Sequence, residues 1–174
     1  MSKLLSQQET EREDGSWQVV WRQARQPLTL EGRGDAVELL CLTAGRAYTE
    51  RGGWKQALHA GDFLLGGLLG EPTSVVPAVA VGSRLLHVRL PVELLLGLPQ
   101  GGKLLAMLYA ACGGDVIGSR ASWAQAMRTA AEALADKPEG GDEFGDAGRH
   151  LLRYAKLVEL LGYLYEGLSR ERTL

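Results

Sequence analysis

The sequence has few of the residues from which metal centres are built. It contains two cysteines and three histidines in 174 residues, with no Cys-x-x-Cys pair and no His-x-His pair. Protein zinc sites usually draw their ligands from such closely spaced residues. We therefore expect no metal and no cofactor, and we interpret His59, His87 and His150 as surface or satisfied core residues.

The sequence also shows no group of residues typical of nucleophilic catalysis. Cys41 and Cys112 each lie among apolar residues and have no histidine near them in the sequence, and there is no Gly-x-Ser-x-Gly elbow. A cysteine in such surroundings usually behaves as a small buried hydrophobic residue. The sequence therefore predicts no catalytic residue and a protein that is not an enzyme.

An excess of positive charge is missing as well. The formal net charge is −2, whereas phosphate binding requires clustered Lys and Arg, so we expect no direct contact with nucleic acid. The polar segment 1–15 has no apolar run typical of a signal peptide, and Gly, Pro or charged residues interrupt the apolar stretches elsewhere. We expect a cytoplasmic protein without a membrane span.

What the sequence does contain, over residues 16–100, is a series of short apolar segments separated by Gly and Pro. Trp17 to Trp21 alternates with period two, and Val37 to Thr43 is an almost continuous apolar run. Further strands are predicted at Arg46–Glu50, Val75–Val81 and Ser83–Leu90, with a hairpin turn at Arg51-Gly52-Gly53 and a turn before Phe63. Short, evenly spaced strands of this kind indicate a β-barrel or sandwich.

The period becomes helical over residues 101–174. A helix is predicted from Leu104, a second from the cap Ser122 through Leu134, and a third over about 147–168, with a polar linker at about 138–148. The third helix is apolar almost all round, so it packs either on its own barrel or on a partner chain. Its candidate interface residues are Leu157, Leu160, Leu161, Leu164 and Tyr165.

The aromatic residues of the first half are candidates for a ligand pocket. Trp17, Trp21, Trp54 and Tyr48 lie in the barrel half, where inward rings line a pocket for a small apolar or aromatic ligand, with Cys41 as a further lining residue. The alternative is that these side chains are simply core. We carry Trp17, Trp21, Cys41 and Tyr48 forward as the predicted pocket.

Three segments resemble the amino-terminal domains of AraC-type transcription regulators. Residues 58–65 resemble the L-x-x-G-D-x-x-L turn of cupin-like sensor domains, and residues 84–91 look like the strand that ends in Leu-Pro before the helical part. Residues 152–161 are similar to the Lys-x-x-Glu-Leu-Leu helix with which many of these domains end. The resemblance implies an α+β fold: a cupin-like barrel, or double-stranded β-helix, followed by C-terminal α-helices.

The same resemblance implies a function. A regulatory ligand-binding and dimerisation domain is expected, with a small-molecule effector or a regulatory protein as partner and a homodimer formed through the helices. AraC-type regulators continue with two basic helix-turn-helix motifs, which this sequence lacks up to Leu174. The chain is therefore either an excised domain or a standalone protein-interaction adaptor.

Two further alternatives stay open. A cyclic-nucleotide-binding domain shares the Gly61-Asp62 turn and the later Gly70-Glu71, but residues 75–78 offer no Arg for the phosphate. A cupin-type enzyme would require a metal.

Overall fold

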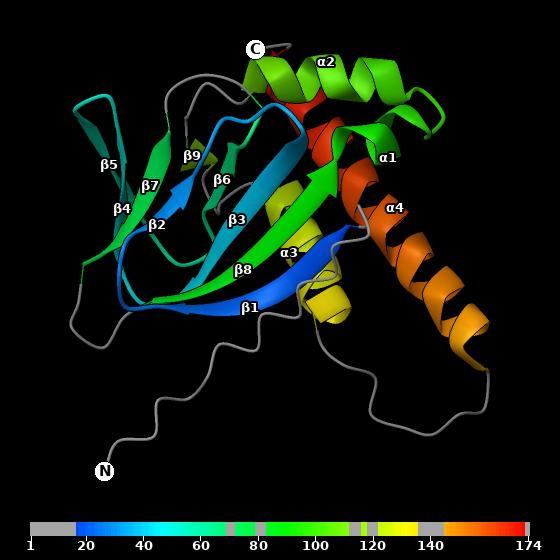
Figure 1. Ribbon diagram of the computed structural model, residues 1–174, viewed down its shortest axis with the longest axis horizontal. Helices are drawn as coiled ribbons and strands as arrows, with labels where there is room; N and C mark the ends of the chain where they lie inside the picture. The colour runs from blue at the N-terminus through cyan, green and yellow to red at the C-terminus, as the bar shows by residue number, and fades with distance from the viewer. Residues whose placement is uncertain are drawn as a thin grey trace.

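The computed structural model describes residues 17–68, 72–78, 83–111, 116–117, 122–135 and 145–172. Within these ranges, antiparallel strands form two facing sheets, and helices cover the outer side of one sheet (Figure 1). The strands are β1 (Gln18–Ala24), β2 (Leu28–Leu30), β3 (Ala36–Ala44), β4 (Ala47–Arg51), β5 (Trp54–Leu58), β6 (Phe63–Gly66), β7 (Thr73–Pro77), β8 (Ser83–Pro91) and β9 (Val116–Ile117). The helices are α1 (Val92–Leu96), α2 (Gly101–Ala111), α3 (Ser122–Ala135) and α4 (Gly145–Arg172).

The strand order identifies the architecture. One sheet has the order β1-β8-β3-β6-β9 and the other β2-β7-β4-β5. Apart from the β4–β5 hairpin, consecutive strands up to β8 therefore alternate between the two sheets, as in a jelly roll or double-stranded β-helix. The predicted cupin-like α+β fold is confirmed, although the two sheets do not close into one continuous barrel.

Alternation along β3 produces two separate apolar cores. Leu39 and Cys41 belong to the core between the five-stranded sheet and the helices, whereas Leu40 and Leu42 belong to the core between the two sheets. Successive side chains of a strand point to opposite faces, so a nearly continuous apolar run is needed where both faces are covered. This requirement explains why residues 37–43 are apolar at almost every position.

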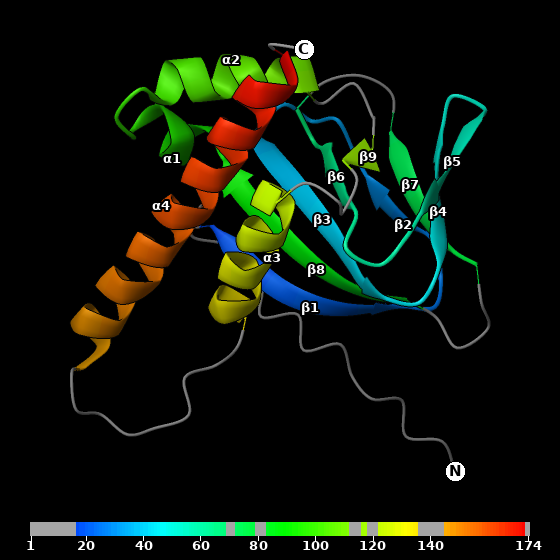
Figure 2. The ribbon, with the colours of Figure 1, turned by 180° about the vertical axis from the view of Figure 1, so that it is seen from behind.

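The helices form a layer on the side of the five-stranded sheet that faces away from the other sheet (Figure 2). α3 presents one apolar face to this core, at the three-and-four spacing that the sequence predicted. The buried residues of α3 are Trp123, Ala124, Met127, Ala130, Ala131 and Leu134. α4 packs against α3 and against part of α2.

Most apolar residues of α4 are satisfied within the chain itself. Leu157, Leu160, Leu161 and Leu164 are at most 3% exposed, and Tyr165 is half-buried at the edge of the same core. Within the chain, α3 and α2 pack against α4. The assignment of these residues to a partner interface stays a prediction. The large apolar side chains that α4 leaves exposed are others: Leu151, Leu152 and Val158.

Several elements were not predicted. β5 is exposed at four of its five positions, so it carries almost no apolar pattern, and β2 and β9 are only three and two residues long. β9 pairs with β6 and so brings the half predicted as helical back to the sheet. α4 begins at Gly145, inside the predicted linker of 138–148. Segment 1–15, residues 79–81 and Cys112 lie outside the described residues.

Two glycines of α4 provide a matched test of this packing. A Cβ at Gly167 would overlap the indole of Trp123, whereas a Cβ at Gly162 would meet nothing within 4 Å. We expect Gly167→Ala to lower the free energy of unfolding by about 1–3 kcal/mol through overpacking. Gly162→Ala should raise it by roughly 0.5–1 kcal/mol, because alanine favours the helix. Urea denaturation followed by circular dichroism measures both, and equal effects would contradict the α3–α4 packing.

Candidate ligand-binding site

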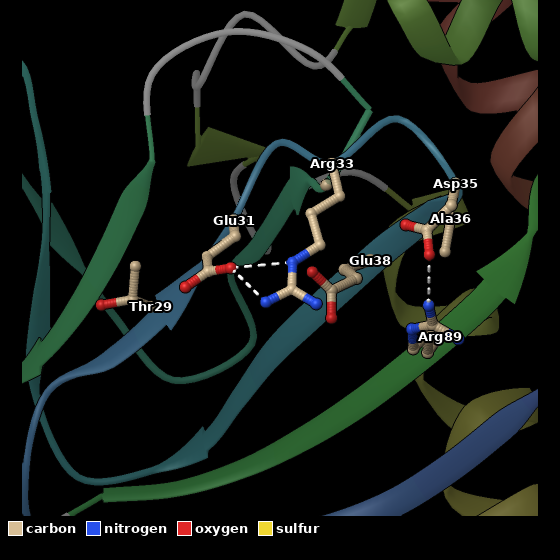
Figure 3. A pocket seen from close by; sticks show the side chains of 8 residues that line it. Thr29, Glu31, Arg33, Asp35, Ala36, Glu38 and Arg89 are labelled. Atoms are coloured by element: carbon tan, nitrogen blue, oxygen red, sulfur yellow. Dashed lines mark hydrogen bonds and ion pairs between the residues drawn. The ribbon is translucent and has the colours of Figure 1, made fainter. Parts of the chain in front are cut away.

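A charged cavity of about 200 Å³ opens between the two sheets. It lies between edge strand β2, with the connection that follows it, and the ends of β3 and β8 (Figure 3). The lining residues are Thr29, Glu31, Arg33, Asp35, Ala36, Glu38, Gly67 and Arg89. Five of these eight side chains carry a formal charge, so the cavity is suited to polar or charged molecules rather than apolar ones.

The floor of the cavity comes from the central strand pair. Glu38 of β3 stands opposite Arg89 of β8 in the antiparallel register. Both side chains lie on the face that carries Leu40 and Leu85, which is the face turned toward the other sheet. Arg89 donates to the Asp35 carboxylate at 3.1 Å, and the ion pair holds the start of β3 beside β8.

Two glycines with positive φ hold the β2–β3 connection over the cavity. Gly34 has φ +80° and Gly67 has φ +91°, in the left-handed region that side chains disfavour. The Gly34 amide donates to the Gly67 carbonyl at 3.0 Å. A Cβ at Gly67 would lie 2.7 Å from the Ala36 carbonyl oxygen. Glycine therefore permits the close approach that forms this side of the site.

Arg33 extends from this connection into the group of carboxylates. Its Nε donates to Glu31 Oε2 at 2.8 Å, and Figure 3 shows its guanidinium between the carboxyl groups of Glu31 and Glu38. The hydrogen bond and charge of Glu31 raise the pKa of Arg33 above its ordinary value, and the charges of Asp35 and Glu38 add to this effect. The Arg33 side chain is 73% exposed, so solvent screens these interactions strongly.

Behind the cavity, a partly buried hydrogen-bonded chain joins three strands. Arg22 Nε of β1 donates to His87 Nδ1 of β8 at 2.8 Å, and His87 Nε2 lies 3.1 Å from Glu38 Oε1 of β3. Because a guanidinium only donates, Nδ1 must accept, and the ring proton is on Nε2, which donates to the carboxylate. The side chains of His87 and Glu38 are 8% and 16% exposed, so this chain fixes Glu38 at the wall of the cavity.

The structure does not bring the four predicted pocket residues together. Trp17, Trp21 and Cys41 lie on the helix-facing side of the five-stranded sheet, in or against the helix core. Tyr48 lies on the outer face of the other sheet, because its neighbour Ala47 faces the inter-sheet core. The four side chains therefore do not meet in one place, and Trp17, Trp21 and Cys41 pack in or against the helix core, as the alternative interpretation expected.

Trp17, Trp21 and Tyr48 each contact a basic side chain instead. The guanidinium carbon of Arg84 lies 4.1 Å from the ring centroid of Trp21, and that of Arg153 from α4 lies 5.2 Å from that of Trp17. Lys55 lies over the ring of Tyr48. Cation–π contacts of this kind stabilise packing at the rims of sheets and helices. Trp54, in the β4–β5 hairpin, is 83% exposed.

Sequence reasoning missed the polar residues of the site: Arg22, Glu38, His87 and Arg89. A signal was present, because Glu38 interrupts the apolar run 37–43 and Arg89 interrupts the run that ends at Pro91. A charge within a strand that is covered on both faces indicates a buried polar site. The spacing of His87 to the other histidines indicated only a surface or satisfied core residue and gave no sign of its partners Arg22 and Glu38.

Within the described residues, no three His, Cys, Asp or Glu side chains are placed together as metal ligands. His59 Nδ1 lies 3.5 Å from Asp62 Oδ2, whose carboxylate also accepts from the His59 amide, and His150 is exposed on α4. No helix in the described part of the chain is both long enough and apolar enough to cross a membrane.

Comparisons with known proteins agree with this architecture. No protein-family model matches the sequence, and no curated protein is similar to it. Among solved structures, the AraC-like transcriptional activator CuxR is 14% identical, with 85% of this chain covering 52% of CuxR at a TM-score of 0.55. The chain shares the fold of an AraC-like activator. The fold implied by the sequence resemblance is thereby confirmed.

A second solved protein supports the same architecture. Apo ToxT K231A from Vibrio cholerae is 9% identical, with 89% of this chain covering 56% of ToxT at a TM-score of 0.55. ToxT from Vibrio cholerae O395 is 8% identical, with 90% and 55% covered and a TM-score of 0.50. The chain thus spans about half the length of these AraC-like-fold structures.

The burial of Cys41 leads to a testable prediction about the reactivity of its thiol. Burial raises the pKa of the Cys41 thiol to about 12, with Arg128 acting in the opposite direction. In a Cys112→Ser variant, we expect Cys41 to be inert to a disulfide reagent at about pH 8 while the protein is folded, because the thiolate is the nucleophile. The thiol should react at once in concentrated guanidinium. Rapid reaction of the folded protein would show that Cys41 lines an open pocket after all.

Proposed function

We propose that this chain is a regulatory ligand-binding domain whose small-molecule effector binds in the charged cavity between β2 and the β3–β8 pair. One observation carries the proposal. The Arg22–His87–Glu38 chain connects the cavity to three neighbouring strands, and the opposite face of the same strands supports the helices. A ligand that engages Glu38 therefore acts on strands that the helices contact.

The route from cavity to helices is short along β1. Arg22 belongs to the cavity side and its neighbour Trp21 to the helix side. At the start of the strand, Arg153 of α4 stacks on Trp17 and also donates to the Leu134 carbonyl near the end of α3 at 3.2 Å. A ligand that binds one arrangement of β1 more tightly than another shifts α3 and α4 with it.

Binding, rather than catalysis, fits the chemistry of the cavity. Its eight lining residues include no His and no Cys, and the hydroxyl of Thr29 is hydrogen-bonded to Ser74 at 3.0 Å. Paired charges of this kind orient a polar ligand. The likeness in fold to CuxR, an AraC-like transcriptional activator, supports a regulatory role. A cytoplasmic location accompanies this proposal.

The proposal predicts that ligand binding and helix dynamics are coupled. Polar metabolites that raise the Tm of the purified protein should lose this effect in Glu38→Gln, because the variant changes the cavity wall. The same ligands should slow amide hydrogen exchange in α3 and α4 as well as in β1, β3 and β8. A matched control is Glu50→Gln, on β4 and outside the cavity lining. Protection confined to the strands would contradict the proposed coupling.

We further propose a homodimer through the exposed side of α4. Leu151 and Val158 are 67% and 42% exposed, and they share a face because they lie seven residues, about two helical turns, apart. Leu152, 66% exposed, extends the patch. Pairing of α4 with its copy would remove this apolar surface from water.

Sedimentation over a micromolar concentration series tests the dimer. We expect the wild-type protein to associate and the double variant Leu151→Glu/Val158→Glu to remain a monomer with unchanged Tm. Leu161→Glu is the control. Leu161 is buried within the chain, so a charge there should lower the free energy of unfolding of the monomer by roughly 3 kcal/mol. A wild-type protein that stays monomeric throughout the series would refute this part of the proposal.

A further inference from the structure

The charge balance of the cavity is negative. Three carboxylates, Glu31, Asp35 and Glu38, face two guanidiniums, Arg33 and Arg89. Arg89 is committed to Asp35 in an ion pair between the ends of two strands. Arg33 is therefore the cation that balances the remaining carboxylates, and with Arg33 turned away the cavity would carry two net negative charges.

Arg33 is the least firmly held of these charged groups. It lies on the connection between β2 and β3, is 73% exposed, and forms an ion pair with Glu31, two residues away on the same connection. By contrast, Glu38 lies on strand β3 and is hydrogen-bonded to His87 of β8. Arg89 lies on β8 and is hydrogen-bonded to Asp35, directly before β3. The carboxylates of the strands thus keep their places when Arg33 moves, because their own positions do not depend on it.

The cavity also has a definite size. At about 30 Å³ for each water-sized group, its volume of about 200 Å³ holds on the order of seven such groups. This is the scale of a short-chain amine or guanidine. The resident Arg33 guanidinium occupies the place where the head of such a molecule would lie.

We propose that the cavity binds a small organic cation, an alkyl amine or guanidine, that replaces the Arg33 guanidinium between Glu31 and Glu38. This inference rests on the proposed ligand-binding function and specifies its ligand chemistry and its regulation. Arg33 then competes with the ligand for the two carboxylates, and the ligand must displace its guanidinium in order to bind. The β2–β3 connection, which carries Arg33, therefore changes conformation at the mouth of the cavity when the ligand is bound.

Calorimetric titration of the full chain with agmatine tests this inference, with glutarate as the anionic probe and 1,5-pentanediol as the neutral one. We expect agmatine alone to bind. Arg33→Gln should bind agmatine about fivefold more tightly, because a weak, screened ion pair no longer competes. Glu38→Gln should weaken binding about tenfold or more, because a buried carboxylate partner is lost. Arg25→Gln, exposed and outside the lining, is the matched control and should change nothing.

Glu31→Gln should also weaken agmatine binding. Glu31 is exposed on the β2–β3 connection, so this variant should fold normally. Unchanged or weaker agmatine binding by Arg33→Gln would overturn the role of Arg33. Binding of glutarate in place of agmatine would overturn the cation preference while leaving the cavity a ligand site. If no probe binds either protein, the inference fails, and the exchange experiment with metabolite ligands still decides the proposed function separately.

Discussion

The register of β3 against β8 is the constraint on which the rest of the structure depends. It places Glu38 opposite Arg89 on the inner face, and it turns Leu39 and Val88 toward the helices. Because side chains alternate with period two, a shift of β3 by one residue would move Glu38 under the helices and turn Leu39 toward the other sheet. Burying unpaired charge is costly, so the helix core and the charged site enforce the same register.

His87 links this constraint to function. A neutral imidazole that accepts from Arg22 and donates to Glu38 gives each of the three groups a hydrogen-bond partner in a partly buried region. The carboxylate at the wall of the cavity is thus positioned from behind by β1 and β8. The helices bind the other face of these strands, so the site and the helical layer share one sheet as their common support.

Much of the fold could be predicted from local patterns. The run 37–43, the three-and-four spacing of α3 and the hairpin turn at Arg51-Gly52-Gly53 each correspond to observed elements. β5 could not be predicted, because four of its residues are exposed and backbone pairing with β4 alone makes it a strand. The site could not be predicted either, since Arg22, Glu38 and His87 are far apart in sequence and meet only through strand pairing.

The sequence by itself determined the periodicities: which segments alternate, which are helical, and that the last helix carries apolar residues that need a covering partner. Only the tertiary structure decided which face of each strand looks inward. It placed Trp17 and Trp21 on the helix side and Glu38 at the cavity, and it buried Leu157 and Leu164 in a helix layer where α3 and α2 pack against α4. The physical reason is that periodicity defines two faces of an element, whereas the partner of each face depends on contacts between residues distant in the chain.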